Sequence, residues 1–177
     1  MKTNTKFSIR TMAVMAMIAA IYAAVTVAQA AIGFGPIQFR IAESLNLLVF
    51  FNPLYMPAVL LGVFIANFIA SPYGLVDVIV GTGASFIALA LILLTKKLTN
   101  NLFVASLWPT IVNALMIPLV FLIYAGEGVS WEAFLPFAAS VAIGQFVVVT
   151  IFGYILLRFL MAKYPKFIEI ITVMRVG

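Results

Sequence analysis

Cysteine and histidine are both missing from this chain of 177 residues. Their absence excludes disulfide bonds, thiolate and imidazole metal ligands, cysteine nucleophiles and Ser–His–Asp triads. The sequence also contains no glycine-rich phosphate loop, so it carries no ATPase motif of its own. We therefore expect the chain not to be an enzyme, and to hold neither a cofactor nor a metal ion.

Charged residues are scarce as well. They make up 8% of the chain, against about 25% in a typical soluble domain. Hydrophobic residues make up 66%, and the mean hydropathy is +1.24. Such a chain cannot build a water-facing surface, so its surface must face lipid. The net charge of +5 arises from Lys and Arg at the ends of apolar runs. That pattern is typical of membrane orientation signals and favours them over nucleic-acid binding.

The apolar runs predict an all-α integral membrane protein, with 1–177 as a single domain of six helices. A membrane-spanning helix needs about 20 apolar residues, and polar residues, glycine or proline separate the runs. The second run is too short to cross a bilayer upright, so we expect it to be buried among its neighbours or steeply tilted. The expected helices cover about 11–32, 39–51, 54–70, 75–95, 102–125 and 134–161, and a basic tail follows.

Basic residues predict the orientation of the bundle. The N-terminal segment, the pair Lys96-Lys97 and the C-terminal tail are basic and should face the cytoplasm. Six crossings satisfy all three positions at once and place both termini in the cytoplasm. The loops around 33–40, 71–74 and 126–132 then lie outside.

Polar residues inside the apolar helices gather at one depth. At a rise of 1.5 Å per residue, they fall in the outer half of the bilayer or near its middle. Polar groups at membrane depth are costly and usually functional, so we expect an outward-facing ligand pocket. Its candidate residues are Arg40, Glu43, Asn67, Asp77, Asn113 and Gln145, with Gln29 and Asn46 as weaker candidates.

Each candidate also has a structural interpretation. Arg40 can pair with Glu43 across one helical turn, and Asp77 can cap the helix that begins near residue 75. The carboxamides can act as hydrogen bonds between helices. If the residues instead form a site, carboxylates beside carboxamides suit a ligand with adjacent N–H donors and carbonyl acceptors. A guanine-like heterocycle has this pattern, and a second carboxylate can neutralise a ligand amine.

Alanine recurs every four residues along the first helix, at Ala16, Ala20, Ala24 and Ala28. Small residues at this spacing allow another helix to approach closely within a membrane. The stripe is therefore either an internal packing face or a docking face for a partner.

The segment Phe34-Gly35-Pro36-Ile37-Gln38-Phe39-Arg40-Ile41-Ala42-Glu43-Ser44-Leu45 resembles the queuosine-precursor transporter (QueT) family. The resemblance continues at 65–67, 74–77, 109–114 and 144–145. At the last of these the family more often has Gly-Glu, so Gln145 replaces an acidic residue.

The resemblance implies a six-helix substrate-binding S component of an energy-coupling factor (ECF) transporter in a prokaryotic cytoplasmic membrane. Such a subunit captures a deazapurine outside and docks on a membrane-embedded T component that two cytoplasmic ATPases drive. Small residues of the first helix contact the T component in this family, which points to Ala16 and Ala20. The loop over 33–38, with Phe34 and Gln38, would cover the site.

The resemblance also suggests a role for each candidate residue. Glu43 would hold the N–H edge of the base, and Asp77 would assist it or neutralise an amine. The remaining hydrogen bonds would come from Asn67, Asn113 and Gln145. Two alternatives stay open: an S component for another vitamin or an aromatic amino acid, and a stand-alone carrier in which Glu43 and Asp77 relay protons.

Overall fold

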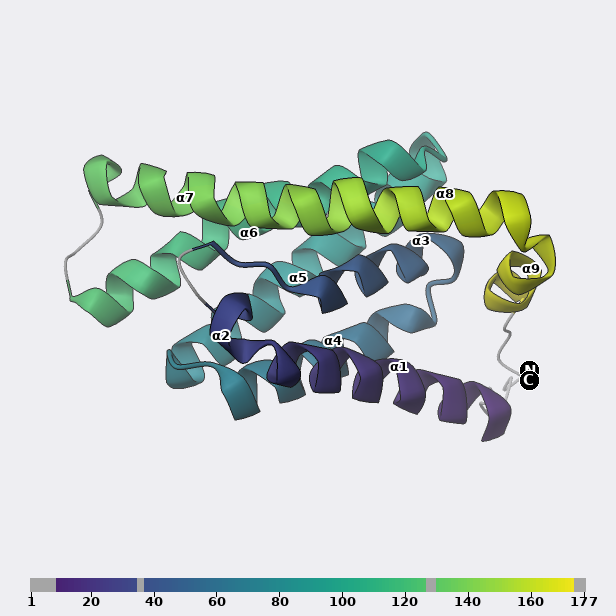
Figure 1. Ribbon diagram of the computed structural model, residues 1–177, viewed down its shortest axis with the longest axis horizontal. Coiled ribbons are helices and arrows are strands. Elements are labelled where there is room, and N and C mark those ends of the chain that lie inside the picture. The colour runs from purple at the N-terminus through teal and green to yellow at the C-terminus, as the bar shows by residue number, and fades with distance from the viewer. Residues whose placement is uncertain (1–8, 35–36, 127–129, 174–177) are drawn as a thin grey trace, which may run out of the picture.

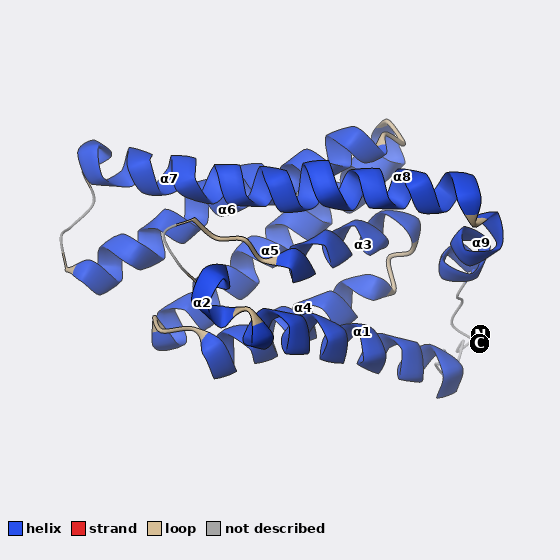
Figure 2. Cartoon of the chain, in the orientation of Figure 1, coloured by secondary structure: helices blue, strands red, loops and turns tan. Residues whose placement is uncertain are grey.

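The computed structural model describes residues 9–34, 37–126 and 130–173, and every element within them is a helix. Figure 2 shows these helices joined by short loops. Most are α-helices, but η1 is a 3₁₀ helix and η2 is a π-helix. In chain order they are α1 Ile9–Ala28, α2 Ala30–Gly33, η1 Ile41–Leu47, α3 Leu48–Phe51, α4 Tyr55–Ala70, α5 Gly74–Leu98, α6 Leu102–Ala125, α7 Trp131–Gln145, η2 Phe146–Gly153, α8 Tyr154–Lys163 and α9 Pro165–Val173.

Four of the described helices are long and apolar enough to cross a membrane. They are α1, α5, the stretch Leu102–Tyr124 of α6, and the continuous helix Trp131–Lys163 that α7, η2 and α8 form together. The helices Ile41–Phe51 and Tyr55–Ala70 are apolar but shorter. The chain is therefore a helical membrane protein with several apolar spans, while six crossings and the cytoplasmic placement of both termini stay predictions.

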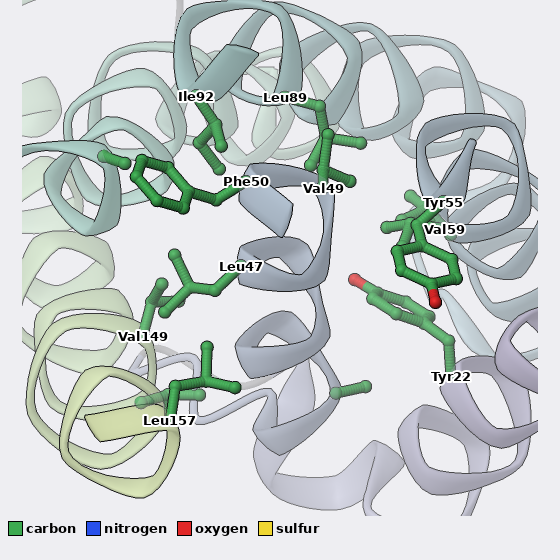
Figure 3. Close-up of a cluster of buried hydrophobic side chains, with 14 of the residues drawn as sticks. Tyr22, Leu47, Val49, Phe50, Tyr55, Val59, Leu89, Ile92, Val149 and Leu157 are labelled. Atoms are coloured by element: carbon green, nitrogen blue, oxygen red, sulfur yellow. The ribbon is translucent and has the colours of Figure 1, made fainter. Parts of the chain in front are cut away.

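The short helix of η1 and α3 lies at the centre of the bundle. Figure 3 shows its side chains Leu47, Val49 and Phe50 surrounded by apolar residues of other helices. All three are at most 5% exposed. Tyr22 of α1 and Leu89 of α5 belong to the same core. This segment is too short to span a bilayer upright. Because it is buried among longer helices, its apolar side chains contact protein rather than lipid.

The longer helices pack in sequence around this centre. Contacts join α1 to α4, α4 to α5, α5 to α6, and α6 to α7, while η1 lies against η2. A second, smaller core of Ala84, Val112, Ile117, Phe121 and Val141 fills the space between α5, α6 and α7. The start of α1 and all of α9 lie at the same end of the bundle (Figure 1).

The first and the last spanning helices differ from the sequence-based expectation. The first helix, expected over 11–32, is divided at Gln29 into α1 and α2. The last spanning helix begins at Trp131 rather than near 134, because the Ser130 hydroxyl accepts a hydrogen bond from the Ala133 N–H and caps it. The earlier start lengthens the continuous helix Trp131–Lys163.

The basic tail also contains a helix, α9, that folds back on the bundle. Its Ile171 is buried in the central core. The Tyr55 hydroxyl donates to the Ile171 carbonyl at 2.9 Å, and the Asn52 amide donates to the Thr172 carbonyl at 3.2 Å. Side chains at the start of α4 thus satisfy carbonyls near the C-terminal end of α9, which its own helix leaves unpaired.

Candidate functional site

Arg40 lies at the junction of four parts of the chain. It directly precedes η1 and is 3% exposed. Its Nε donates to the Gly33 carbonyl at 3.0 Å, and its Nη1 donates to Asn67 Oδ1 at 3.2 Å. Its Nη2 is 3.7 Å from Asp77 Oδ2. The planar guanidinium suits this arrangement, because it presents several donors in fixed directions. Arg40 therefore ties η1 to α2, α4 and α5.

Asp77 lies in the first turn of α5 and is 1% exposed. Its Oδ2 accepts a hydrogen bond from the Ser71 hydroxyl at 2.6 Å. The same hydroxyl accepts from the Tyr73 N–H at 3.2 Å. Asp77 is thus engaged by Arg40 and Ser71, and Arg40 pairs with it rather than with Glu43, the pairing that one-turn spacing had offered. A negative charge at this helix start is also favoured by the helix dipole.

Glu43 sits in the 3₁₀ turn of η1 and is 1% exposed. The Tyr22 hydroxyl of α1 donates to its Oε1 at 2.8 Å, and the Asn46 amide donates to its Oε2 at 2.5 Å. Tyr22 and Asn46 are completely buried. The Asn46 Oδ1 has no hydrogen-bond partner within the described residues. Glu43, Tyr22 and Asn46 therefore form a second polar group beside the Arg40 network.

Phe34 and Tyr73 close one side of the Arg40 network. The Arg40 guanidinium lies over the Phe34 ring, 4.3 Å from its centroid, in cation–π geometry. The Tyr73 hydroxyl donates to the Phe34 carbonyl at 3.2 Å. Burial raises the pKa of Tyr73, so this hydroxyl keeps its proton at neutral pH. The expected lid over 33–38 includes residues 35–36, which lie outside the described residues.

Gln38 approaches the bundle at Gly144 of α7. A Cβ on Gly144 would overlap the Gln38 backbone carbonyl, so this contact requires glycine. Gln38 is 2% exposed. Gln38, the last residue of the expected lid, is therefore packed against α7 at the residue before Gln145.

Asn113 and Gln145 are both buried, at 3% and 2% exposure. Each lies one helical turn from a member of the smaller core, Ile117 and Val141 respectively. Both amides therefore face the interior between α6 and α7. Gln145 Oε1 has no hydrogen-bond partner within the described residues. The described contacts join Arg40, Asn67 and Asp77 directly, and they leave Asn113 and Gln145 outside that network.

Two irregular helices meet at this polar region. η1 carries Glu43 and Asn46, and η2 begins directly after Gln145. The two segments contact each other. Long 3₁₀ and π segments have poorer hydrogen-bond geometry than α-helices and are frequent at functional sites.

Sequence reasoning did not identify Tyr22 and Ser71 as site residues. Tyr22 lies in an apolar run where a hydroxyl has no distinguishing pattern, and Ser71 was part of an expected turn. Asn46 was only a weak candidate, although its spacing of three residues from Glu43 already placed the two on one helical face.

The alanine stripe of α1 is exposed. Ala16, Ala20, Ala24 and Ala28 all face away from the bundle, while Tyr22 and other residues of the opposite face pack against the core. The stripe is therefore not an internal packing face of the described structure.

The chain is similar in sequence to known proteins. The model of a family described as QueT transporter matches residues 12–162. The Queuosine precursor transporter QueT of Lactococcus lactis subsp. cremoris (strain MG1363) is 39% identical over 106 residues. That alignment covers 58% of this chain and 60% of the relative's length. No solved structure matches.

Proposed function

The chain belongs to the QueT transporter family, and on this premise we propose that it binds a queuosine precursor, a 7-deazaguanine derivative, at the outer side of a prokaryotic cytoplasmic membrane. It then delivers the ligand inward as the S component of an ECF importer, together with a T component and two cytoplasmic ATPases. The observation that carries the proposal is the buried polar network of Arg40, Asn67 and Asp77 beside Glu43 in a chain with so few charged residues.

The hydrogen-bonding capacity left in this network fits a guanine-like edge. Each Glu43 oxygen accepts one described hydrogen bond, and a carboxylate can accept about four. Arg40 Nη2 makes no hydrogen bond within the described residues and can donate to a ligand carbonyl. We assign the ring carbonyl of the base to Arg40 and an N–H donor group of the ligand to Glu43. The amides of Asn67, Asn113 and Gln145 supply further hydrogen bonds, and Gln38 and Phe34 cover the ring.

The charge distribution supports an outward-facing site. Asp77 lies in the first turn of α5, and Lys96 and Lys97 lie in its last turn. The basic end of this helix should face the cytoplasm. The nineteen positions between Asp77 and Lys96 correspond to about 28 Å of helix, nearly the thickness of the hydrocarbon core. We therefore propose that the network lies near the outer interface.

The exposed face of α1 supports a membrane-embedded partner. Ala16 lies in the first half of α1 and Ala20 just past its middle, and both are exposed and present little side-chain volume to a neighbour. Close approach of helices at small residues is a common mode of association within lipid. We propose that the T component docks here.

Calorimetry on the purified full-length chain tests the substrate. We expect saturable binding of 7-cyano-7-deazaguanine, 7-aminomethyl-7-deazaguanine or queuine, and weaker or undetectable binding of adenine as a matched heterocycle. If none of the three deazapurines binds, the proposed substrate class is wrong. Co-purification with a T component and ATPases tests the importer role separately, and transport by the isolated chain in liposomes would contradict that role.

A further inference from the structure

Glu43 has no cation of its own. Both of its described partners are neutral: the Tyr22 hydroxyl and the Asn46 amide. Arg40 lies only three residues earlier, but its guanidinium is directed to Gly33, Asn67 and Asp77. The described ion pair of this region is Arg40 with Asp77, so the polar cluster contains one cation and two carboxylates.

An uncompensated carboxylate is unfavourable at this position. Glu43 is 1% exposed, and its two partners are completely buried. Removing a carboxylate from water costs more free energy than two hydrogen bonds from neutral donors recover, unless a positive charge compensates it. A positive charge that binds next to Glu43 would supply this compensation.

The free hydrogen-bonding atoms around Glu43 are acceptors. Both carboxylate oxygens retain acceptor capacity, and Asn46 Oδ1 is unpaired within the described residues. The orientation of the Asn46 amide is fixed, because its nitrogen donates to Glu43. A group bound here must therefore supply N–H donors and no lone pair. An ammonium group fits, whereas a nitrile or a carbonyl would bring one acceptor against others.

We propose that Glu43, Asn46 and Tyr22 form a subsite for a protonated amine on the ligand, and that this subsite selects cationic over neutral precursors. The proposal rests on the proposed function, since it specifies the ligand of the same site. It gives Glu43 the amine-neutralising role expected of Asp77 from the sequence, because the Asp77 carboxylate already has the Arg40 cation and the Ser71 hydroxyl at its Oδ2. Tyr22 and Asn46 hold the carboxylate in place, and Asn46 adds an acceptor.

Two ligands that share one ring system test the proposal. 7-Aminomethyl-7-deazaguanine carries an ammonium group at neutral pH, and 7-cyano-7-deazaguanine carries a neutral acceptor at the same ring position. We expect calorimetry on the full-length protein to show about tenfold or more tighter binding of the amine. Equal affinities, or tighter binding of the nitrile, would overturn the proposal without touching the proposed function. Binding of neither ligand would overturn both.

Two variants then identify the carboxylate that is responsible. Glu43→Gln keeps the side-chain shape and removes the charge, so the amine-to-nitrile affinity ratio should fall to about one. Asp77→Asn serves as the matched control. It weakens the ion pair with Arg40. The affinities for the amine and for the nitrile should therefore fall by a similar factor, and their ratio should stay unchanged. An unchanged ratio in Glu43→Gln, or a ratio that collapses in Asp77→Asn instead, would overturn the assignment to Glu43. The amine-to-nitrile affinity ratio of the wild-type protein tests the proposal even if a variant does not fold.

Discussion

Gly81 and Gly83 offer a matched pair of substitutions in α5. A Cβ on Gly81 would lie 2.6 Å from Asn67 Nδ2 and 3.1 Å from Asp77 Oδ1. A Cβ on Gly83 would meet nothing within 4 Å. Both residues are in the same helix, so alanine changes the intrinsic helix propensity equally at the two positions. Any difference between the two variants therefore reports on the contact with Asn67.

The structure gives the size of the expected effect. Non-bonded heavy atoms are comfortable at about 3.5 Å, so the Asn67 amide must move by about 1 Å in Gly81→Ala. That shift breaks the hydrogen bond from Arg40 Nη1 to Asn67 Oδ1, now 3.2 Å long. A hydrogen bond to a charged group contributes about 1.5–3 kcal/mol. If ligand binding depends on this network, affinity should fall about 10- to 100-fold.

Calorimetric titration of both variants with 7-aminomethyl-7-deazaguanine measures this effect. Thermal unfolding in the same detergent reports any loss of stability. We expect Gly83→Ala to bind like the wild type and Gly81→Ala to bind more weakly while remaining folded. If the two variants bind the ligand equally well, the Arg40–Asn67–Asp77 network does not support the site, and the reasoning is refuted.

Three further substitutions test separate parts of the account. Arg40→Lys removes the fixed fork of donors and should weaken ligand binding about tenfold or more; full affinity would show that the guanidinium geometry is unimportant. Ala16→Leu should reduce co-purification with the T component and leave ligand affinity unchanged. The control Ala139→Leu, at an exposed alanine of α7, should change neither co-purification nor ligand affinity; equal recovery of the T component with both variants would exclude α1 as the docking face. Tyr55→Phe removes the hydroxyl bond to the Ile171 carbonyl and should increase hydrogen exchange in α9 about fivefold, and unchanged exchange would show that this bond does not hold α9.

The helices and the central position of the short segment were predictable because lipid imposes simple limits on sequence. An apolar run of about 20 residues must span, and a run of eleven or so must be covered by protein. The ends of α4 and α6 follow from turn signals such as Asn52-Pro53 and the polar Asn101, whose side chain accepts hydrogen bonds from the first N–H groups of α6. These features depend on residues close together in the chain, so the sequence alone predicts them.

The division of the polar residues into two groups was not predictable. Arg40 is as close in sequence to Glu43 as an ion pair on one helix requires, yet it pairs with Asp77, because Arg40 has extended backbone before η1 and its guanidinium is directed to α4 and α5. The role of Tyr22 depends on how closely α1 approaches η1. Helix α9 was not predicted, because a nine-residue helix is too short to be stable alone, and its packing against α3 and α8 is not visible in the sequence.

A structure of the full-length protein with bound 7-aminomethyl-7-deazaguanine tests the central claim most directly. We predict that the ring lies beside the Arg40 network and that the ammonium nitrogen is within hydrogen-bond distance of Glu43 and Asn46. The apolar cleft lined by Leu115, Leu119, Trp131 and Phe134, between the C-terminal half of α6 and the start of α7, is the alternative location. Ligand found there, with the Arg40 and Glu43 side chains untouched, would contradict the account.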